Sequence, residues 1–357
     1  MAALAAGLRG RVVLLDRFGG QDAAALMVDG RLDELRIDPG DGRLMPGAIC
    51  RALPDRPARG LGGWFLRLPG GRTGFLRQAQ GVVAGRSLLV QVTAPERGGK
   101  AIAVTTRLAL RGRHAVITPG APGLNLSRRI RDAEVRARLE GLLATAVTMA
   151  GAGEGSGVIL RSAAAGAPVE EILAELTVLN ERAGALLSEG AAPALLLDAP
   201  GAHEIARRDW RDPAPEAIED RPGCLAAHGV HEAVDALLQR VVPLAGGGRM
   251  VIEPTEALVA VDVDAGADLA PPAAAAANRA AARELARQLR LRGLGGQVVI
   301  DFAPIPRQGR AALAQTLRAA FATDEGASLA GWSNLGLFEM TRRRDRPALA
   351  GLWPGQG

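Results

Sequence analysis

The sequence predicts a multidomain α/β protein with α+β parts, organised around one β-α-β unit. Residues 257–264 alternate apolar and polar side chains, as a half-buried strand does. Residues 278–292 repeat Ala and Leu at helical spacing before Gly293, and residues 297–302 form the short apolar run of a buried parallel strand. Upstream, strand patterns broken by Gly and Pro over residues 40–110 predict a separate small barrel.

The N-terminal residues 11–37 contain three strand patterns. A Gly-Gly pair separates the first two, and Asp29-Gly30, a strong signal of a two-residue hairpin, separates the last two. We therefore expect an antiparallel sheet here, with Asp16 as a turn residue.

The barrel region holds five short strand patterns with turn signals between them, and an OB-fold is the natural candidate. Trp64, Phe65 and Phe75 are notable because only 3% of the chain is aromatic. Rings on such a barrel stack the bases of single-stranded nucleic acid, at about 1–3 kcal/mol per base. The same rings would equally suit the barrel core, so the pattern leaves both roles open.

The middle of the chain alternates helix and strand patterns. Helices are expected over 132–146, 169–187 and 230–242, and a strand ends at Arg161 and Ser162. A guanidinium beside a hydroxyl matches phosphate oxygens, although such a pair is common at strand ends.

The histidines of this region are His203, His228 and His231. Their spacing is not that of metal ligands, so they are predicted to be surface or loop residues. After the β-α-β unit, a helix over 307–322 and a strand over 331–338 are expected to complete its sheet.

Carboxylates stand at the end of both strands of the β-α-β unit: Asp262, Asp264 and Asp301. Side chains two apart on a strand share a face, and parallel strands end at one edge of the sheet, so the three are expected to converge. Their repulsion requires protons, arginines or a hard cation, and an oxygen-only site favours Mg²⁺ or Mn²⁺ over zinc. The alternative is that each Asp only starts a turn.

Composition bounds the remaining possibilities. The 357 residues, 48% hydrophobic and 23% charged, suit a globular protein of two or three modules. A net charge of +5 weakly favours a polyanionic partner. Cys50 and Cys224 form no C-x-x-C pair, so we expect no zinc site. No apolar run approaches ~20 residues, so we expect no membrane segment and a cytoplasmic location.

Three segments resemble the nuclease subdomain of the ribonuclease E/G family: TEALVAVDVD, ARQLRLRGLGGQVVIDF and NLGLFEMTRRR. The resemblance implies a Mg²⁺-dependent endoribonuclease, a hydrolase that cleaves single-stranded RNA by attack of metal-activated water on the phosphodiester. It assigns the metal to Asp262 and Asp301. Asp264, also in the catalytic group, stands where the family usually has Asn.

The resemblance extends to the RNA-binding regions through WFLRLPGGRTGFL, ERGGKAIAVTT and SRRI. It implies that Phe65, Phe75 and Lys100, the only lysine, contact RNA. It places Arg161 and Ser162 in a 5′ sensor that binds the RNA 5′-monophosphate. Trp64 stands where the family more often has a small residue.

The family also implies domain boundaries. The expected parts are an RNase H-like subdomain (1–39 and 189–240), an OB-fold barrel (40–110), a 5′-sensor subdomain (111–188) and a DNase I-like catalytic subdomain (241–357). The family's zinc-linking C-P-x-C segment has no counterpart here, so no zinc-linked dimer is expected, and monomer and dimer both stay open.

Two other functions compete with an RNA-processing endoribonuclease. The first is an RNA-binding protein of the same family with impaired catalysis, suggested by Asp264 in place of Asn. The second is a phosphodiesterase that acts on DNA, which a comparison of RNA and DNA substrates would distinguish.

Overall fold

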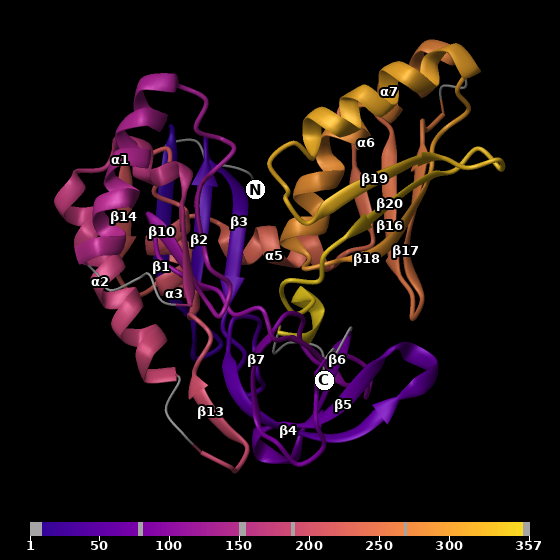
Figure 1. Cartoon of the computed structure of the whole chain (residues 1–357). Helices are drawn as coiled ribbons and strands as arrows, with labels where there is room; N and C mark the ends of the chain where they lie inside the picture. Colours follow the sequence, from indigo (N-terminus) through magenta and orange to yellow (C-terminus); the bar gives the residue numbers. More distant parts are fainter. Residues whose placement is uncertain (1–8, 78–80, 150–154, 187–189, 268–269, 353–357) are drawn as a thin grey trace. The chain divides into compact units, whose positions relative to one another are not determined.

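The computed structural model confirms the predicted fold class, a multidomain α/β protein with a closed barrel (Figure 1). Contacts divide the chain into two compact units, residues 1–40 with 214–357, and residues 41–213. No helix in the described parts of the chain is both long and apolar enough to span a membrane. The structure describes residues 9–77, 81–149 (backbone only over 145–149), 155–186, 190–267 and 270–352.

The first sheet of the discontinuous unit is built mainly from the N-terminal strands. Gly19, Gly20, Asp29 and Gly30 all have positive φ, as two-residue hairpins of this twist require, so both expected turns are confirmed. The short helices α4 (Cys224–Ala227) and α5 (Val230–Leu238) pack against the core of this sheet. Its strands, in spatial order, are β14 (Ala217–Asp220), β1 (Arg11–Phe18), β2 (Gln21–Val28) and β3 (Arg31–Ile37).

Asp16 was predicted to lie in a turn, and this prediction is wrong. The residue lies within β1, and its Oδ2 accepts a hydrogen bond of 3.2 Å from the backbone N–H of Leu225. The first N–H groups of a helix have no partner within the helix, so this carboxylate stabilises the start of α4.

The barrel closes because β4 pairs with both β5 and β7, while β8 pairs with β6 and β7. Within this ring β6 and β8 are parallel and the other pairs are antiparallel, which is the expected OB-fold topology. Leu66, Leu76 and Val90 belong to its core. The elements are β4 (Ile49–Ala58), η1 (Arg59–Leu61), β5 (Gly63–Arg67), η2 (Pro69–Gly71), β6 (Thr73–Arg77), β7 (Leu88–Val92) and β8 (Ile102–Thr105), with β13 (Ala194–Leu197) beside β4.

The unit of residues 41–213 contains a second sheet, and the expected helices lie between and after its strands. Asp132 accepts hydrogen bonds from the N–H groups of Glu134 and Val135 at 2.9 and 3.0 Å, which fixes the start of the first helix. The second ends at Leu186, and the predicted end at Leu187 lies outside the described residues. The elements are β9 (Leu110–Arg111), β10 (Ala115–Pro119), β11 (Gly123–Leu126), α1 (Ala133–Met149), β12 (Ser156–Leu160), η3 (Ser162–Gly166), α2 (Val169–Leu186) and α3 (Ala202–Asp209).

The last sheet contains the predicted β-α-β unit. One face is buried under α6 (Pro271–Leu291) and α7 (Arg307–Ala320), which share a core with Val261 and Ile300 (Figure 1). The strands, in spatial order, are β15 (Val241–Pro243), β16 (Arg249–Pro254), β17 (Leu258–Asp264), β18 (Gly296–Asp301), β20 (Phe338–Arg342) and β19 (Ala327–Trp332), followed along the chain by η4 (Leu349–Gly351).

Three boundaries near this sheet differ from expectation. Helix α6 starts at Pro271, before residue 278, because prolines fit the first helical positions and an alanine run follows. The helix expected over 230–242 ends at Leu238, where strand β15 soon follows. The strand expected over 331–338 is wrong, because residues 333–337 form the hairpin turn between β19 and β20. The Ser333 N–H closes this turn with a hydrogen bond of 2.8 Å to the Leu337 carbonyl.

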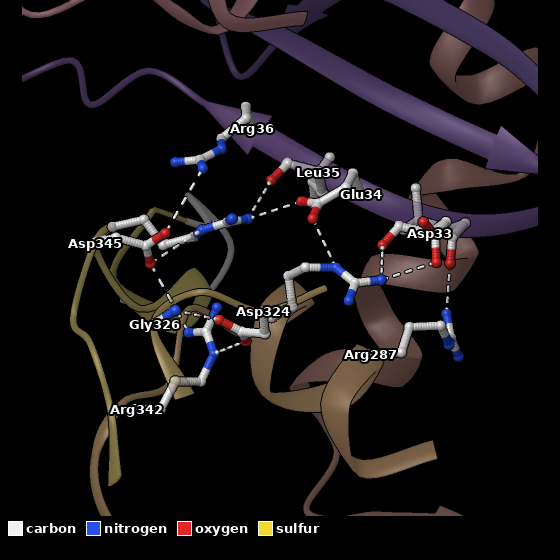
Figure 2. Close-up of polar contacts among 12 residues, drawn as sticks. Asp33, Glu34, Leu35, Arg36, Arg287, Asp324, Gly326, Arg342 and Asp345 are labelled. Carbon is white, nitrogen blue, oxygen red and sulfur yellow. Dashed lines mark hydrogen bonds and ion pairs between the residues drawn. The ribbon is translucent and has the colours of Figure 1, made fainter. Parts of the chain in front are cut away.

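A polar cluster joins β3 to α6 and to the segment after β20 (Figure 2). At its centre, the Glu34 carboxylate contacts Arg290 Nε at 2.6 Å and Arg346 Nη1 at 3.1 Å. Arg346 also donates to the Leu35 carbonyl at 3.3 Å, and its side chain is only 9% exposed. The partly buried Glu34 carboxylate therefore connects the N-terminal sheet to the helix and the C-terminal segment of the last sheet.

We predict that Glu34→Ala lowers the free energy of unfolding by about 3 kcal/mol, because it leaves two poorly solvated guanidinium groups without this anion. Urea unfolding of the whole chain measures the loss. Arg17→Ala, which removes an exposed ion pair with Asp22, is the control and should cost less than about 1 kcal/mol. Equal losses in the two variants would contradict a structural role for the cluster.

Candidate active site

Two carboxylates face each other on the open side of the last sheet. Asp262 of β17 and Asp301 of β18 are register partners in a parallel pair, and both are exposed. Neighbouring strands lie about 4.8 Å apart. The buried residues Val261, Val263 and Ile300 alternate with them and hold the opposite face against the helices. The strand alternation thus turns both acids away from the core.

The electrostatic environment of Asp262 reflects this pairing. Burial and the neighbouring Asp301 carboxylate raise the pKa of Asp262, with Asp264 adding to the effect and Arg249 opposing it. A cation bound beside two neighbouring carboxylates would stabilise their ionised forms.

Asp264 has its own partners. Its Oδ2 lies 2.9 Å from Nη2 of Arg249, its register partner on β16, and its Oδ1 accepts a hydrogen bond of 2.8 Å from Gly266 N–H. The hydrogen bond from Gly266 N–H, together with the Arg249 guanidinium, lowers the pKa of Asp264, although desolvation opposes this shift. This carboxylate is therefore ionised and paired.

The expected convergence of three acids is not found. Among the residues that the structure describes, no group of three or more His, Cys, Asp or Glu side chains is arranged to hold a metal ion. Asp262 and Asp301 remain as two facing oxygen donors. Their chemistry fits Mg²⁺ or Mn²⁺, which bind through one or two carboxylates and keep several waters and substrate phosphates as further ligands.

The aromatic residues of the barrel lie on two different faces. Phe65 and Phe75 are cross-strand partners with ring centroids 5.5 Å apart, and Arg56 lies 4.9 Å from the Phe65 centroid. Neither ring belongs to the barrel core, whereas Trp64 packs against it. Trp64 therefore supports the core, and the Phe pair forms an outer aromatic platform, for which base stacking stays a prediction.

Lys100 precedes β8, the strand that pairs with β6. It is exposed in the loop that leads into β8, where its N–H bonds the Arg97 carbonyl at 2.9 Å. Ala103 of β8 is the register partner of Phe75. The lysine therefore lies in the loop before the strand that carries the partner of Phe75, and its contact with RNA stays a prediction.

Arg161 is held at the end of β12 by three contacts. Its backbone N–H bonds the His114 carbonyl at 2.7 Å, Nη1 donates to the Gly112 carbonyl at 2.5 Å, and Nη2 pairs with Asp209 at 2.9 Å. Burial would raise the pKa of Asp209, but contacts with Arg208 and Arg161 outweigh it and lower this pKa. Ser162 follows as the first residue of η3. The guanidinium is thus fixed, with its side chain 27% exposed.

Of the three histidines predicted to be surface or loop residues, His228 lies in the turn between α4 and α5, as predicted, whereas His203 and His231 lie on helices α3 and α5. His228 Nε2 lies 2.9 Å from Glu219 Oε1, and its side chain is largely buried. The His231 ring, on α5, packs edge-on against Phe18 with centroids 5.1 Å apart. Both have structural partners within the first sheet.

The sequence analysis missed Arg249, Asp209 and Arg56 as site residues. Arg249 could have been found by pairing the strands around the turn at residues 255–257, which places it opposite Asp264. Asp209 is far from Arg161 in sequence, and no local pattern signals that contact.

Comparisons with known proteins give a family match and named relatives. The family model described as "Ribonuclease E/G family" matches residues 109–220 and 215–345. This match covers more than half of the chain and includes all three aspartates and the Arg161–Ser162 pair.

Curated relatives carry the same family's names. Ribonuclease E of Nostoc sp. is 32% identical over 72% of this chain and 43% of its own length, and that of Haemophilus influenzae is 31% identical over 75% and 32%. Ribonuclease G of Salmonella typhimurium is 29% identical over 74% of this chain and 61% of its own. The chain thus spans less than two thirds of the length of these relatives.

Proposed function

Because the chain belongs to the ribonuclease E/G family, we propose that it is an endoribonuclease that cleaves single-stranded RNA with a divalent cation held by Asp262 and Asp301. The observation that carries this proposal is the register of β17 and β18, which sets the two carboxylates opposite each other on an open sheet face. Mg²⁺ is the preferred ion and Mn²⁺ the alternative. The relatives' names, ribonuclease E and ribonuclease G, support RNA as the substrate.

The chemistry follows from the donor set. A divalent cation held here would supply Lewis acidity, which would lower the pKa of water and offset charge on the scissile phosphate. Asp262 and Asp301 would hold the ion, and β17 and β18 fix their backbones through ladder hydrogen bonds. Asp262 and Asp301 are both exposed, so an RNA phosphate can reach them. In-line attack of water on the phosphorus would form one P–O bond and break the bond to one ester oxygen, which leaves with a proton from the water, so one product end carries a phosphate and the other a hydroxyl.

The barrel supplies binding that does not depend on sequence. Phe65 and Phe75 offer π-faces on which successive bases stack, and Lys100 and Arg56 provide positive charge for the backbone. Stacking requires unpaired bases, so this surface favours single strands over duplexes.

Arg161 and Ser162 are proposed to bind the RNA 5′-monophosphate. An arginine has five N–H donors, and the contacts to Gly112 and Asp209 use one on each terminal nitrogen. The remaining donors, with the Ser162 hydroxyl, suit phosphate oxygens. Because Gly112 and Asp209 already fix the guanidinium, little conformational entropy is lost on binding.

We predict that Asp301→Asn lowers the rate of cleavage of a 5′-monophosphorylated single-stranded RNA in Mg²⁺ by more than about 100-fold. Loss of a residue that only supports a metal ligand costs up to about 100-fold, and loss of a ligand itself should cost more. Gel electrophoresis measures cleavage, and EDTA should abolish it in the unaltered chain. RNA binding, followed by fluorescence anisotropy, should persist in the variant. Binding without cleavage in the unaltered chain would favour the catalytically impaired RNA-binding protein, and faster cleavage of DNA would favour the DNA phosphodiesterase.

We expect Arg161→Gln to reduce the preference for 5′-monophosphorylated over 5′-hydroxyl RNA by about tenfold, because it removes charged hydrogen bonds to phosphate. The measured quantity is the ratio of the two cleavage rates. Arg138→Gln is the matched control, since Arg138 donates to the Ala165 carbonyl at 2.6 Å in the same subdomain. An unchanged ratio in Arg161→Gln would rule out this residue as the sensor.

The aromatic platform gives a third prediction. Phe65→Ala and Phe75→Ala should each raise the dissociation constant for a single-stranded RNA at least about fivefold, the lower limit for losing one stacked base. Leu61→Ala, which truncates an apolar side chain 65% exposed on the same barrel, is the control and should change little. If all variants bind the RNA with equal affinity, the two rings do not contact RNA and have only a structural role.

A further inference from the structure

Asp264 lies where it would be expected to join the metal pair. It follows Asp262 by two residues on β17, so both side chains leave the same face of the sheet. A third ionised carboxylate there would add negative charge to the site and a competing oxygen ligand. Its position alone would predict three acids on one cation.

The Arg249 side chain accounts for the different arrangement in the structure. Arg249 is the cross-strand partner of Asp264, and its Nη2 contacts Oδ2 at 2.9 Å. Gly266 N–H occupies the other oxygen, Oδ1, at 2.8 Å. Both oxygens of Asp264 therefore have partners within the protein, and the pair carries no net charge.

We propose that Arg249 is a positioning residue that keeps Asp264 out of the metal site and cancels its charge, so that Asp262 and Asp301 alone set the affinity for the divalent cation. This inference rests on the proposed metal site. It names a function for Arg249, the strand residue that follows the glycine run before β16.

Each charge change in this pair should therefore shift the affinity for the cation in a defined direction. Neutralising Arg249 uncovers one negative charge beside the pair and strengthens cation binding. Neutralising Asp264 uncovers one positive charge and weakens it. Neutralising both restores the balance. The Arg249 and Asp264 side chains are 60% and 39% exposed, and exposed ion pairs contribute little to stability, so these variants should fold.

The test is a titration of the whole chain with Mn²⁺ alone, without RNA, followed by the electron paramagnetic resonance signal of free Mn²⁺. Arg249→Gln should tighten Mn²⁺ binding by about three- to tenfold, the range expected for one unit charge acting through a water-exposed site. Asp264→Asn should weaken it by a similar factor. The double variant and the charge-conserving Arg249→Lys should bind like the unaltered chain.

Two controls separate the possible failures. Arg17→Gln removes one positive charge, as Arg249→Gln does, but from an exposed cross-strand ion pair on another sheet. It should leave the Mn²⁺ affinity unchanged. Asp301→Asn should abolish binding. If Asp301→Asn abolishes binding but Arg249→Gln and Asp264→Asn leave affinity unchanged, the role of Arg249 is overturned and the metal site stands. If the unaltered chain binds no Mn²⁺, the metal site and the role of Arg249 both fail.

Discussion

The parallel pairing of β17 and β18 is the constraint on which the site depends. A parallel ladder keeps its two strands in one register, so Asp262 and Asp301 lie side by side on the same face of the sheet. Helix α6 makes the connection that parallel strands require, and its alanines and leucines pack on the buried face. The position of the two acids is therefore set by the backbone, while the repulsion between them is what a cation would relieve.

The surroundings of this pair stabilise it in two ways. Within the sheet, Arg249 neutralises the adjacent Asp264. Beyond it, the cluster around Glu34 connects α6 to β3, so the helix that covers the buried face is also held by the N-terminal sheet. Figure 2 shows these acidic and basic groups alternating across the contact. Side chains distant from Asp262 and Asp301 thus support the sheet that carries both aspartates.

Local sequence patterns predicted the elements that depend on local physics. The alternation in ALVAVDVD, the stop at Gly293 and the Asp29-Gly30 turn each determine their own structure, and all were found. The five-strand barrel was also predicted, because short strands with regular turns have few ways to close. The strand over 331–338 failed, because apolar residues flank a Ser-Asn-Leu-Gly turn and alone do not reveal it. Asp209 and Glu34 could not be assigned, since their partners come from distant segments. Arg249 could be assigned only by pairing β16 with β17 in the correct register.

The most direct test of the central claim is a crystal of the protein soaked in Mn²⁺ and measured for anomalous scattering. The parallel register predicts one strong peak within coordination distance of a carboxylate oxygen of Asp262 and one of Asp301, with Asp264 still bound to Arg249. A peak elsewhere, or Asp262 and Asp301 oxygens too far apart to share one ion, would contradict it.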